Sequence, residues 1–367
     1  MKIGVLTSSR ADYSIYYPLL KAIQSDSFFS LKIIAFGTHI SHRHGFTLNQ
    51  IIDDNFEVEH SLDTAPVDDT PNAISASMGK TLIMFSEIWH RDKYDLIFCL
   101  GDRYEMFAAC ASTIPFGLRL AHIHGGEQTL GAIDDVFRHS ITNMSDYHFT
   151  ACEAYKKRVI ELKGYDRNVF NVGSLSIDNL RNLKLYEIQE FKERFHIDLS
   201  KPSILITFHP ETVSFEKNEF YINELILALE VTEGYQFIIT MPNADTMGQL
   251  IRNRLYAFIE STNHAFGVES FGTIGYLSCM KHCSLLLGNT SSGYIEASFF
   301  PKYVVDLGNR QLGRIVTDNI HRCNINKNEI LMAIKKFKGF LSLPKIEIYG
   351  KGNAAQKITE ILKTING

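Results

Sequence analysis

The sequence predicts an α/β protein with two Rossmann-like, doubly wound domains. Short apolar runs recur along the chain, and each is followed by a polar turn and an amphipathic stretch with helical periodicity. The runs lack polar alternation, so both faces of each strand are expected to be buried, as in a parallel sheet covered by helices. A length of 367 residues also exceeds what one ordinary core accommodates, which favours two domains.

The N-terminal domain is predicted over residues 1–176. We expect its strands at KIGVLTS, LKIIAFG, DLIFCLG, LAHIHG and YHFTAC, which are residues 2–8, 31–37, 95–101, 120–125 and 147–152. Helical patterns separate these strands at about 14–25, 75–91, 104–113, 134–145 and 153–163.

The pattern restarts in a C-terminal domain predicted over residues 177–350. We expect strands at 203–209, 235–242, 265–271, 284–289 and 303–308, with helices at about 217–232, 246–260, 273–281 and 292–300. The charged segment from about 176 to 202 has no strand signal and is predicted to be a linker. An amphipathic stretch at 353–365 predicts a C-terminal helix.

Charge, hydropathy and cysteine usage exclude several kinds of partner. The formal net charge of −4 leaves no basic surplus for binding a nucleic-acid backbone. The longest apolar runs fall well short of the roughly 20 residues that span a membrane, and MKIGVLTSSR turns polar too early for a signal peptide. No CxxC pair occurs among the six cysteines, and the Cys279/Cys283 spacing favours buried free thiols in a reducing cytoplasm.

Polar residues follow the predicted strands of the first domain, at the edge where open α/β sheets bind ligands. Ser8-Ser9-Arg10 follows the first strand. Arg10 and free backbone N–H groups suit an anion, but helix capping explains the two serines equally well. Asp102 and Arg103 follow a strongly apolar strand, which favours a functional role over a surface ion pair.

Further carboxylates follow the next predicted strand. Glu127 comes after two glycines that let a ligand approach the backbone, and Asp134 and Asp135 open a helical pattern, where their ordinary role is capping. Acids gathered at neighbouring strand ends move one another's pKa values apart, so that one serves as base and another as acid. The grouping predicts proton removal and donation at one site.

His122 and His124 form an HxH pair that could hold a metal. A metal site needs further ligands, and the sequence has neither HExxH nor a matching Asp/His set. A core or substrate-contacting role is therefore favoured, and we predict no metal and no cofactor.

The second domain offers an anion site. His209 closes its first predicted strand, and Asn243 follows the second. The segment GNTSSG places Ser291, Ser292 and Gly293 at a helix start, where hydroxyls, N–H groups and the helix dipole suit a diphosphate. Glu296, one turn inside, is placed to accept ribose hydroxyls, and Arg310 adds a charge after a later strand. An ordinary serine-capped helix is the simpler alternative.

Motifs of other nucleotide-binding or hydrolytic classes are absent from the sequence. No GxGxxG follows a strand, and neither GxxxxGK[ST] nor GxSxG occurs. A dinucleotide-dependent dehydrogenase, a P-loop phosphotransferase and an α/β-hydrolase are thereby disfavoured.

Taken in order, these segments resemble the hydrolysing UDP-N-acetylglucosamine 2-epimerases, which open sialic acid biosynthesis. The matching landmarks are TSSRADYS, GDRYE, HIHGGE, GAIDDVFRH, FHPET, MPNAD, GNTSSGYIEA and DLGNRQLGR, spanning residues 2–314. The resemblance implies a GT-B-like fold with the active site in the interdomain cleft and the C-terminal helix packed on the first domain. It also implies a cytoplasmic homodimer or homotetramer that needs no cofactor.

The resemblance further implies a reaction and its residues. UDP-N-acetylglucosamine and water would give N-acetylmannosamine and UDP, by elimination to 2-acetamidoglucal and hydration with inversion at carbon 2. Asp102, Glu127 and Asp134 match the family's catalytic acids, with Asp135 as a one-residue alternative, and His209 matches the histidine at the diphosphate. The positions matching nucleotide and substrate contacts are Arg10, Arg103, Asn243, Ser291, Ser292, Gly293, Glu296 and Arg310.

Three alternatives stay open. A GT-B glycosyltransferase would share the nucleotide site but would not need three clustered acids. A nucleotide-sugar sensor would bind UDP without turnover. Close relatives of the family use UDP-2,4-diacetamido-2,4,6-trideoxyglucose, of the legionaminic acid pathway, and the residue pattern does not distinguish that sugar from UDP-N-acetylglucosamine.

Overall fold

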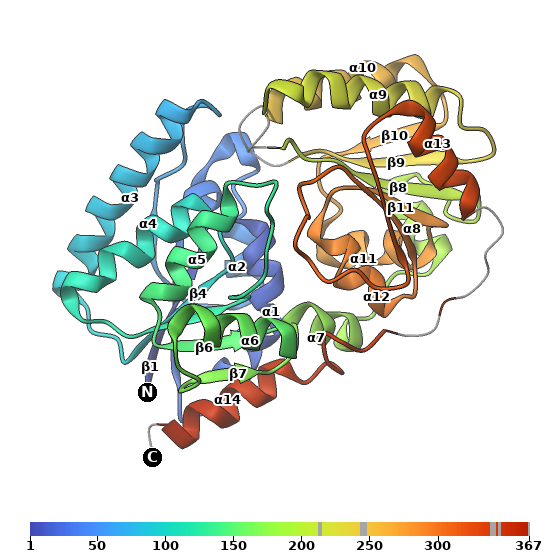
Figure 1. The fold of residues 1–367 in the computed structure, drawn as a ribbon. Helices are drawn as coiled ribbons and strands as arrows, with labels where there is room; N and C mark the ends of the chain where they lie inside the picture. The colour runs from blue at the N-terminus through green and yellow to red at the C-terminus, as the bar shows by residue number, and fades with distance from the viewer. Residues whose placement is uncertain (212–214, 243–247, 338–342, 344–345, 366–367) are drawn as a thin grey trace. The chain divides into compact units, whose positions relative to one another are not determined.

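The protein is described by a computed structural model covering residues 1–211, 215–242, 248–337, 343 and 346–365. The chain divides into two compact units. Unit 1 comprises Met1–Glu127, Asp134–Arg181 and Ile348–Gly367, and unit 2 comprises Gln128–Ile133 and Asn182–Glu347. Each unit is a parallel sheet with helices on both faces (Figure 1).

The sheet of unit 1 has the doubly wound strand order β3-β2-β1-β4-β5-β6, with β7 added beside β6. Every described pairing in it is parallel. The strands are β1 (Lys2–Thr7), β2 (Ser30–Phe36), β3 (Val58–Leu62), β4 (Leu96–Leu100), β5 (Leu120–Ile123), β6 (Tyr147–Thr150) and β7 (Val169–Asn171).

Helices cover both faces of this sheet. They are α1 (Arg10–Gln24), α2 (Leu48–Asp53), α3 (Pro71–Arg91), α4 (Tyr104–Thr113), α5 (Asp134–Met144), α6 (Glu153–Lys163), α7 (Leu175–Asn182) and α14 (Ala354–Ile365). One apolar core joins β1, β4 and β5 to α1 and α14, and another joins the opposite sheet face to α3 and α4. Strands buried on two faces explain their unbroken apolar runs.

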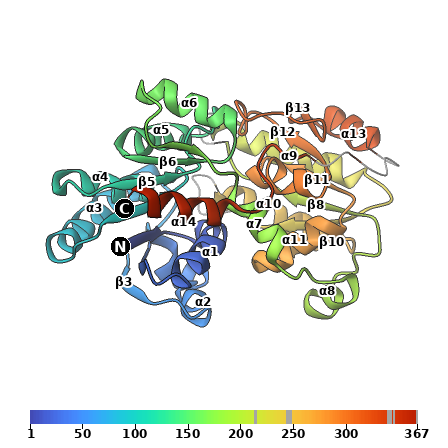
Figure 2. The same cartoon turned by 90° about the horizontal axis from the view of Figure 1, so that it is seen from below.

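The C-terminal helix α14 belongs to unit 1 and packs against α1 (Figure 2). Ile358 and Leu362 from α14 are fully buried in the same core as the first strand. The carboxylate of Asp178 in α7 accepts hydrogen bonds from the N–H groups of Ala354 and Ala355, at 2.9 and 2.8 Å. Asp178 thereby satisfies two of the N–H groups that a helix start leaves unpaired.

Unit 2 repeats the same winding with the order β10-β9-β8-β11-β12-β13. Its strands are β8 (Ser203–Thr207), β9 (Gln236–Thr240), β10 (Ala265–Val268), β11 (Leu285–Gly288), β12 (Tyr303–Leu307) and β13 (Ile320–Cys323). Its helices are α8 (Ile188–Phe195), α9 (Asn218–Glu230), α10 (Gly248–Ser261), α11 (Gly272–His282), α12 (Glu296–Phe299) and α13 (Lys327–Lys336). The prediction of two doubly wound parallel sheets is confirmed.

The structure also contains elements that the sequence pattern did not predict. Three of them, β3, β7 and β13, are edge strands. An edge strand is only partly covered, so it needs no continuous apolar run, and VEHSL, VFN and IHRC contain none. The predicted linker at 176–202 instead holds α7 and α8. Most of α7 is buried, including the charged Asp178, whereas α8 buries Phe191 and leaves its charged residues toward solvent.

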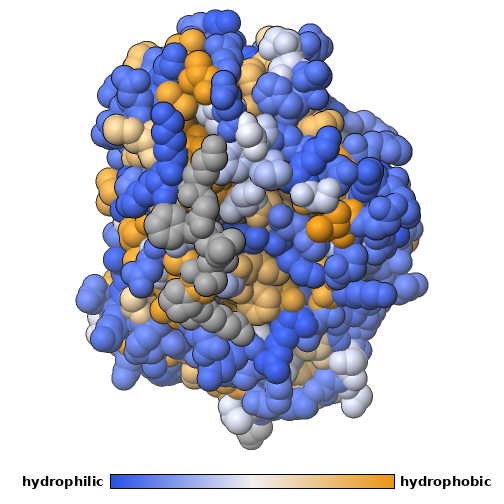
Figure 3. Space-filling view, turned by 90° about the vertical axis from the view of Figure 1, so that its right-hand side faces the viewer, coloured by the Kyte–Doolittle hydropathy of each residue, from blue (hydrophilic) through white to orange (hydrophobic). Residues whose placement is uncertain are grey.

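One face of the surface and two of the cysteines can be compared with the sequence predictions. Hydrophilic side chains cover most of the face in Figure 3, where hydrophobic ones form small separate groups. Cys279 and Cys283 are buried free thiols, as the spacing predicted. Within the described residues, no helix has the length and hydropathy needed to cross a membrane.

Candidate active site

The doubly wound order places a topological switch point between β1 and β4 in unit 1 and between β8 and β11 in unit 2. Loops after the two strands at such a point diverge, because their helices lie on opposite faces of the sheet, and ligands bind in the space so formed. The predicted site residues of each unit follow these strands and their neighbours.

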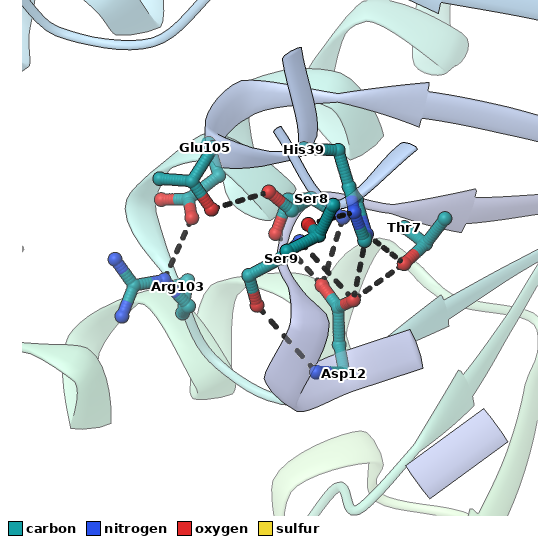
Figure 4. A network of polar contacts seen from close by, with 9 residues as sticks. Thr7, Ser8, Ser9, Asp12, His39, Arg103 and Glu105 are labelled. Carbon is teal, nitrogen blue, oxygen red and sulfur yellow. Dashed lines mark hydrogen bonds and ion pairs between the residues drawn. The ribbon is translucent and has the colours of Figure 1, made fainter. Parts of the chain in front are cut away.

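The turn after β1 is organised by Asp12. Its carboxylate accepts hydrogen bonds from the backbone N–H and hydroxyl of Ser8, at 2.8 and 2.7 Å, and from the hydroxyl of Thr7 at 2.5 Å (Figure 4). Ser9 and Asp12 form a capping box at the start of α1. The capping explanation is thereby confirmed for Ser9, whereas Ser8 donates to the Asp12 carboxylate, and Arg10 is the first residue of the helix.

His39 completes this network from the loop after β2 (Figure 4). Its Nε2 lies 2.9 Å from the Thr7 hydroxyl and 3.9 Å from the Asp12 carboxylate. Burial by itself raises the pKa of Asp12, but hydrogen bonds and the charge interaction with His39 outweigh it and lower that pKa. The turn therefore holds an ionised carboxylate inside unit 1.

Asp102 and Arg103 lie directly after β4, as predicted. The Nε of Arg103 donates to the Glu105 carboxylate at 2.6 Å (Figure 4). The carboxylate of Asp102 is paired with the guanidinium of Arg138, whose other terminal nitrogen lies 3.5 Å from Asp135. Arg138 is only 2% exposed, so one buried cation connects two of the candidate acids.

Arg138 is a site residue that the sequence analysis missed. It lies in α5, one helical turn after Asp134 and Asp135, in the segment DDVFRH. Residues three or four apart share a helix face, so this spacing was the available signal. Asp134 and Asp135 both sit in the first turn of α5, and Asp135 also lies 3.7 Å from the ring of His139.

Glu127 is buried after β5 and is held by His124. The Nδ1 of His124 lies 2.6 Å from the Glu127 carboxylate, and both side chains are under 9% exposed. His124 has a backbone φ of 66°, unusual for a residue with a side chain. A fixed imidazole against a buried carboxylate can relay or stabilise a proton.

His122 has the core role that the sequence analysis favoured. Its Nε2 lies 2.8 Å from the carbonyl oxygen of Gly101, the residue before Asp102, and its Nδ1 lies 3.1 Å from the Thr142 hydroxyl. Burial lowers the pKa of His122 to about 4, so its ring is neutral near pH 7. No group of three or more His, Cys, Asp or Glu suited to a metal occurs among the described residues.

In unit 2 the GNTSSG segment follows β11 as predicted. Thr290 caps a short 3-10 turn at Ser291–Gly293, and the Ser292 hydroxyl lies 2.6 Å from that of Tyr276. The predicted helix at 292–300 is wrong in extent, because α12 holds only four residues, from Glu296. Hydroxyls and turn N–H groups, rather than a helix dipole, are thus what this segment offers an anion.

Close packing of β8 and β11 brings this turn to His209. A Cβ at position 288 would lie 2.0 Å from the carbonyl oxygen of Thr207, so only glycine fits there. Just beyond, the Asn289 side chain accepts from the N–H of His209 at 2.7 Å and donates to its carbonyl oxygen at 2.8 Å. The imidazole and the hydroxyl-rich turn therefore share one switch point.

Arg310 follows β12, the next strand of the same sheet. Its neighbour Asn309 donates its N–H to the buried carboxylate of Glu211 at 2.6 Å. Asn243, the remaining predicted contact, lies outside the described residues.

The strand ends of unit 1 carry carboxylates and a guanidinium, and those of unit 2 carry an imidazole and a hydroxyl-rich turn. These groups, at the edges where doubly wound sheets bind ligands, indicate the class of enzyme that transfers protons on a ligand with an anionic group. The comparisons with known proteins agree. The model of the UDP-N-acetylglucosamine 2-epimerase family matches residues 21–363. The chain belongs to this family of enzymes.

Two relatives support the assignment, and a solved structure shows the fold. The chain is 34% identical to GDP/UDP-N,N'-diacetylbacillosamine 2-epimerase (hydrolyzing) of Campylobacter jejuni, covering 89% of this chain and 85% of the relative. It is 33% identical to polysialic acid biosynthesis protein P7 of Escherichia coli, covering 99% and 93%. The crystal structure of Methanocaldococcus jannaschii UDP-GlcNAc 2-epimerase in complex with UDP-GlcNAc and UDP aligns with a TM-score of 0.85 at 17% identity, over 99% of this chain and 100% of that one. The last comparison confirms the GT-B-like fold.

Proposed function

We propose that this protein is a hydrolysing UDP-sugar 2-epimerase that converts UDP-N-acetylglucosamine and water into N-acetylmannosamine and UDP. Family membership carries the proposal, together with the acids after β4 and β5 and at the start of α5. Residues 1–176, with the helix at 353–365, would supply the catalytic acids, and residues 177–350 would bind the nucleotide.

The proposed reaction has two steps. A carboxylate removes the proton from carbon 2 while the bond from carbon 1 to the diphosphate oxygen breaks, giving 2-acetamidoglucal and UDP. Water then adds, with its oxygen to carbon 1 and a proton to carbon 2 from the opposite face, which inverts carbon 2. No hydride leaves the sugar, so the balance requires no redox cofactor.

We assign the acid–base steps to Asp102, Glu127 and Asp134. The buried pair of Glu127 with His124, at 2.6 Å, supports a proton-transferring role. Arg138 supports the role of Asp102 as well, because the paired guanidinium orients that carboxylate and also lies 3.5 Å from Asp135.

We assign the binding and stabilisation of the UDP leaving group to unit 2. Developing negative charge on the diphosphate would be stabilised by His209, the Ser291–Gly293 turn and Arg310, with Glu296 on the ribose hydroxyls. Arg10, Arg103 and Asn243 complete the proposed contacts. The shared switch point of His209 and Ser291 supports this role, since open α/β sheets bind ligands there.

A second sugar is favoured by the C. jejuni relative, whose name gives diacetylbacillosamine as its substrate. UDP-N,N'-diacetylbacillosamine carries an acetamido group at carbon 4 and a methyl at carbon 5, while its carbons 1 and 2 present the same reacting atoms. The acids and the nucleotide site would serve both sugars, so the choice depends on the rest of the pocket.

The decisive experiment incubates the protein with each UDP-sugar and no acceptor, in D2O. Release of UDP with the 2-epimeric free sugar, deuterated at carbon 2, supports the proposal. UDP release that requires an added acceptor would assign a glycosyltransferase instead, and tight UDP binding without turnover would assign a sensor.

Variants separate the two sets of residues. We expect Asp102→Asn and Glu127→Gln to lower kcat by about 10²- to 10⁴-fold with UDP affinity retained, because an amide cannot exchange the proton. Glu296→Ala should weaken UDP binding instead. Glu153→Gln, at an exposed acid in the first turn of α6, is the matched control and should keep full activity. Near wild-type rates in both acid variants would refute the acid–base roles of Asp102 and Glu127.

The proposal extends to assembly and location. We propose a cytoplasmic homodimer or homotetramer, and the free cysteines support a reducing compartment. Light scattering on the purified protein gives its mass, and a monomer at assay concentration would contradict the oligomer.

A further inference from the structure

At the switch point of unit 2, the fully buried side chain of Asn289 connects the segment after β11 to the segment after β8. The parallel ladder between β8 and β11 ends where the N–H of Asn289 donates to the Thr207 carbonyl at 3.1 Å. One residue further, the two backbones diverge toward opposite faces. There the Asn289 amide takes the place of a peptide group, since it both accepts from and donates to the backbone of His209.

The main chain of Asn289 is also held by a buried side chain. The carbonyl oxygen of Asn289 accepts a hydrogen bond from the Gln311 side chain at 2.8 Å, and Gln311 is itself fully buried. The Gln311 amide oxygen accepts from Arg314 at 2.6 Å. A continuous chain of buried hydrogen bonds therefore runs from the loop after β12, through Asn289, to His209.

Unit 2 contains a chemically matched second clamp two residues along the same loop. Asn218, at the start of α9, accepts from the N–H of Glu211 and donates to its carbonyl oxygen, both at 2.9 Å. It is also fully buried. Asn218 holds the loop from the helix that follows it, whereas Asn289 joins His209 to the hydroxyl-rich turn.

We infer that Asn289 is a positioning residue that sets the His209 imidazole relative to the Ser291–Gly293 turn. The buried Asn289 side chain has both hydrogen-bonding functions used by His209, and the Gln311 amide holds the main-chain carbonyl of the same residue, so the side chain has one low-energy orientation. The peptide of His209 is thus held by Asn289, which lies two residues before the Ser291–Gly293 turn. A leaving diphosphate would then meet the imidazole and the hydroxyls at fixed spacing, which is the preorganisation that electrostatic stabilisation requires.

The inference rests on the proposed function of His209 and the turn, and the two can fail separately. A purely structural role predicts that Asn289 and Asn218 are equivalent, since each fastens one peptide of the same loop with two hydrogen bonds. A positioning role predicts that they differ in catalysis and in UDP binding while costing similar stability. A substitution at Asn218 is therefore the control for the same substitution at Asn289.

The experiment compares Asn289→Ala with Asn218→Ala in the full chain. We would measure the thermal midpoint, kcat and KM on the UDP-sugar that the wild type turns over, the Kd for UDP by calorimetry, and the ¹⁵N signals of the His209 ring with and without UDP. Signals are assigned by comparison with His209→Gln. If either alanine variant does not fold, Asn289→Ser and Asn218→Ser, which keep a small hydroxyl, replace the pair.

We expect both variants to lose similar thermal stability. Asn289→Ala should lower kcat at least tenfold, with a smaller change in KM, and should alter or abolish the UDP-dependent shift of the His209 ring. Asn218→Ala should stay within threefold of wild type. Equal losses in both variants, or an Asn289→Ala protein with unchanged kcat and His209 signals, would overturn the inference. A wild type that turns over neither sugar refutes the proposed function, while UDP affinity and the His209 signals still test the positioning.

Discussion

The guanidinium of Arg138 is paired with the carboxylate of Asp102, although the two residues lie 36 positions apart. Arg138 comes from α5 and Asp102 from the loop after β4, so the pair joins two elements that carry candidate acids. Asp135 approaches the same guanidinium. Two of the acids that the sequence analysis grouped, Asp102 and Asp135, thus share one buried cation.

We expect Arg138→Gln to lower kcat by about 100-fold while UDP affinity changes little. The substitution leaves Asp102 and Asp135 without their shared cation and lets both carboxylates reorient, and losses of this size follow the misplacement of catalytic groups. Arg138→Lys keeps the charge but not the planar two-nitrogen geometry. Its kcat should therefore lie between those of the wild type and Arg138→Gln. Steady-state kinetics with UDP calorimetry tests this, and rates within threefold of wild type for Arg138→Gln would contradict it.

We expect Gly288→Ala to lower the free energy of unfolding by about 3 kcal/mol or more. Its φ is 145°, and an added Cβ would lie 2.0 Å from the Thr207 carbonyl oxygen, so β8 and β11 would have to move apart. Gly272→Ala is the matched control, since its φ of 64° is also positive but no atom lies within 4 Å. It should cost about 1 kcal/mol. Equal losses in urea unfolding would show that the close approach is unimportant.

We expect Asp12→Asn to destabilise the protein at neutral pH but not in acid. The pKa of Asp12 is lower in the fold than its unfolded value, so the ionised carboxylate stabilises the fold above about pH 4 and this contribution is lost as the pH falls further. The difference in unfolding free energy between variant and wild type should therefore shrink as the pH drops below about 4. Asp53→Asn, at an exposed carboxylate, should show no such trend. A constant gap across that range would contradict the role of the charge.

We expect Asp306→Asn to gain stability relative to wild type as the pH rises. Burial raises the pKa of Asp306 to about 6, against the opposing effects of Tyr294 and Arg322. Because the folded-state pKa lies above the unfolded one, the stabilising contribution is present below about pH 4 and is lost as the pH rises through 6. Between pH 4 and pH 6, the unfolding free energy of Asp306→Asn relative to wild type should rise by up to about 3 kcal/mol, because each pKa unit corresponds to about 1.4 kcal/mol. Chemical unfolding below pH 4 and above pH 6 tests this prediction, and Asp318→Asn, at an exposed carboxylate, is the control. A loss of stability of Asp306→Asn relative to wild type at the higher pH would contradict it.

Much of the fold could be predicted because its signals are local. The central strands, such as LIFCL at 96–100, are buried on both faces and therefore contain unbroken apolar runs. The edge strand IHRC at 320–323 is half exposed and carries no such run, so its pairing with β12 follows only from the sheet that is already present. The short α12 shows the same limit, since the hydroxyl-rich segment has a capping pattern but the helix after it holds only four residues.

The candidate site divides in the same way. The positions of Asp102, Glu127 and His209 followed from strand ends, because each of the two parallel sheets brings the ends of its own strands to one edge. Their partners Arg138, His124 and Asn289 did not follow, although His124 and Arg138 lie close in sequence to predicted acids. A hydrogen bond requires a distance and an angle that the spacing of letters leaves open.

The sequence alone determined that this chain folds into two parallel doubly wound sheets and that acids follow one while hydroxyls follow the other. Periodicity and strand length suffice for that, because burial of apolar surface acts on every residue in turn. The tertiary structure decided which charge neutralises Asp102, which amide holds His209 and where each sheet ends. These depend on contacts between residues tens of positions apart, such as the 80 that separate His209 from Asn289, and only the packed chain brings such atoms within 3 Å of each other.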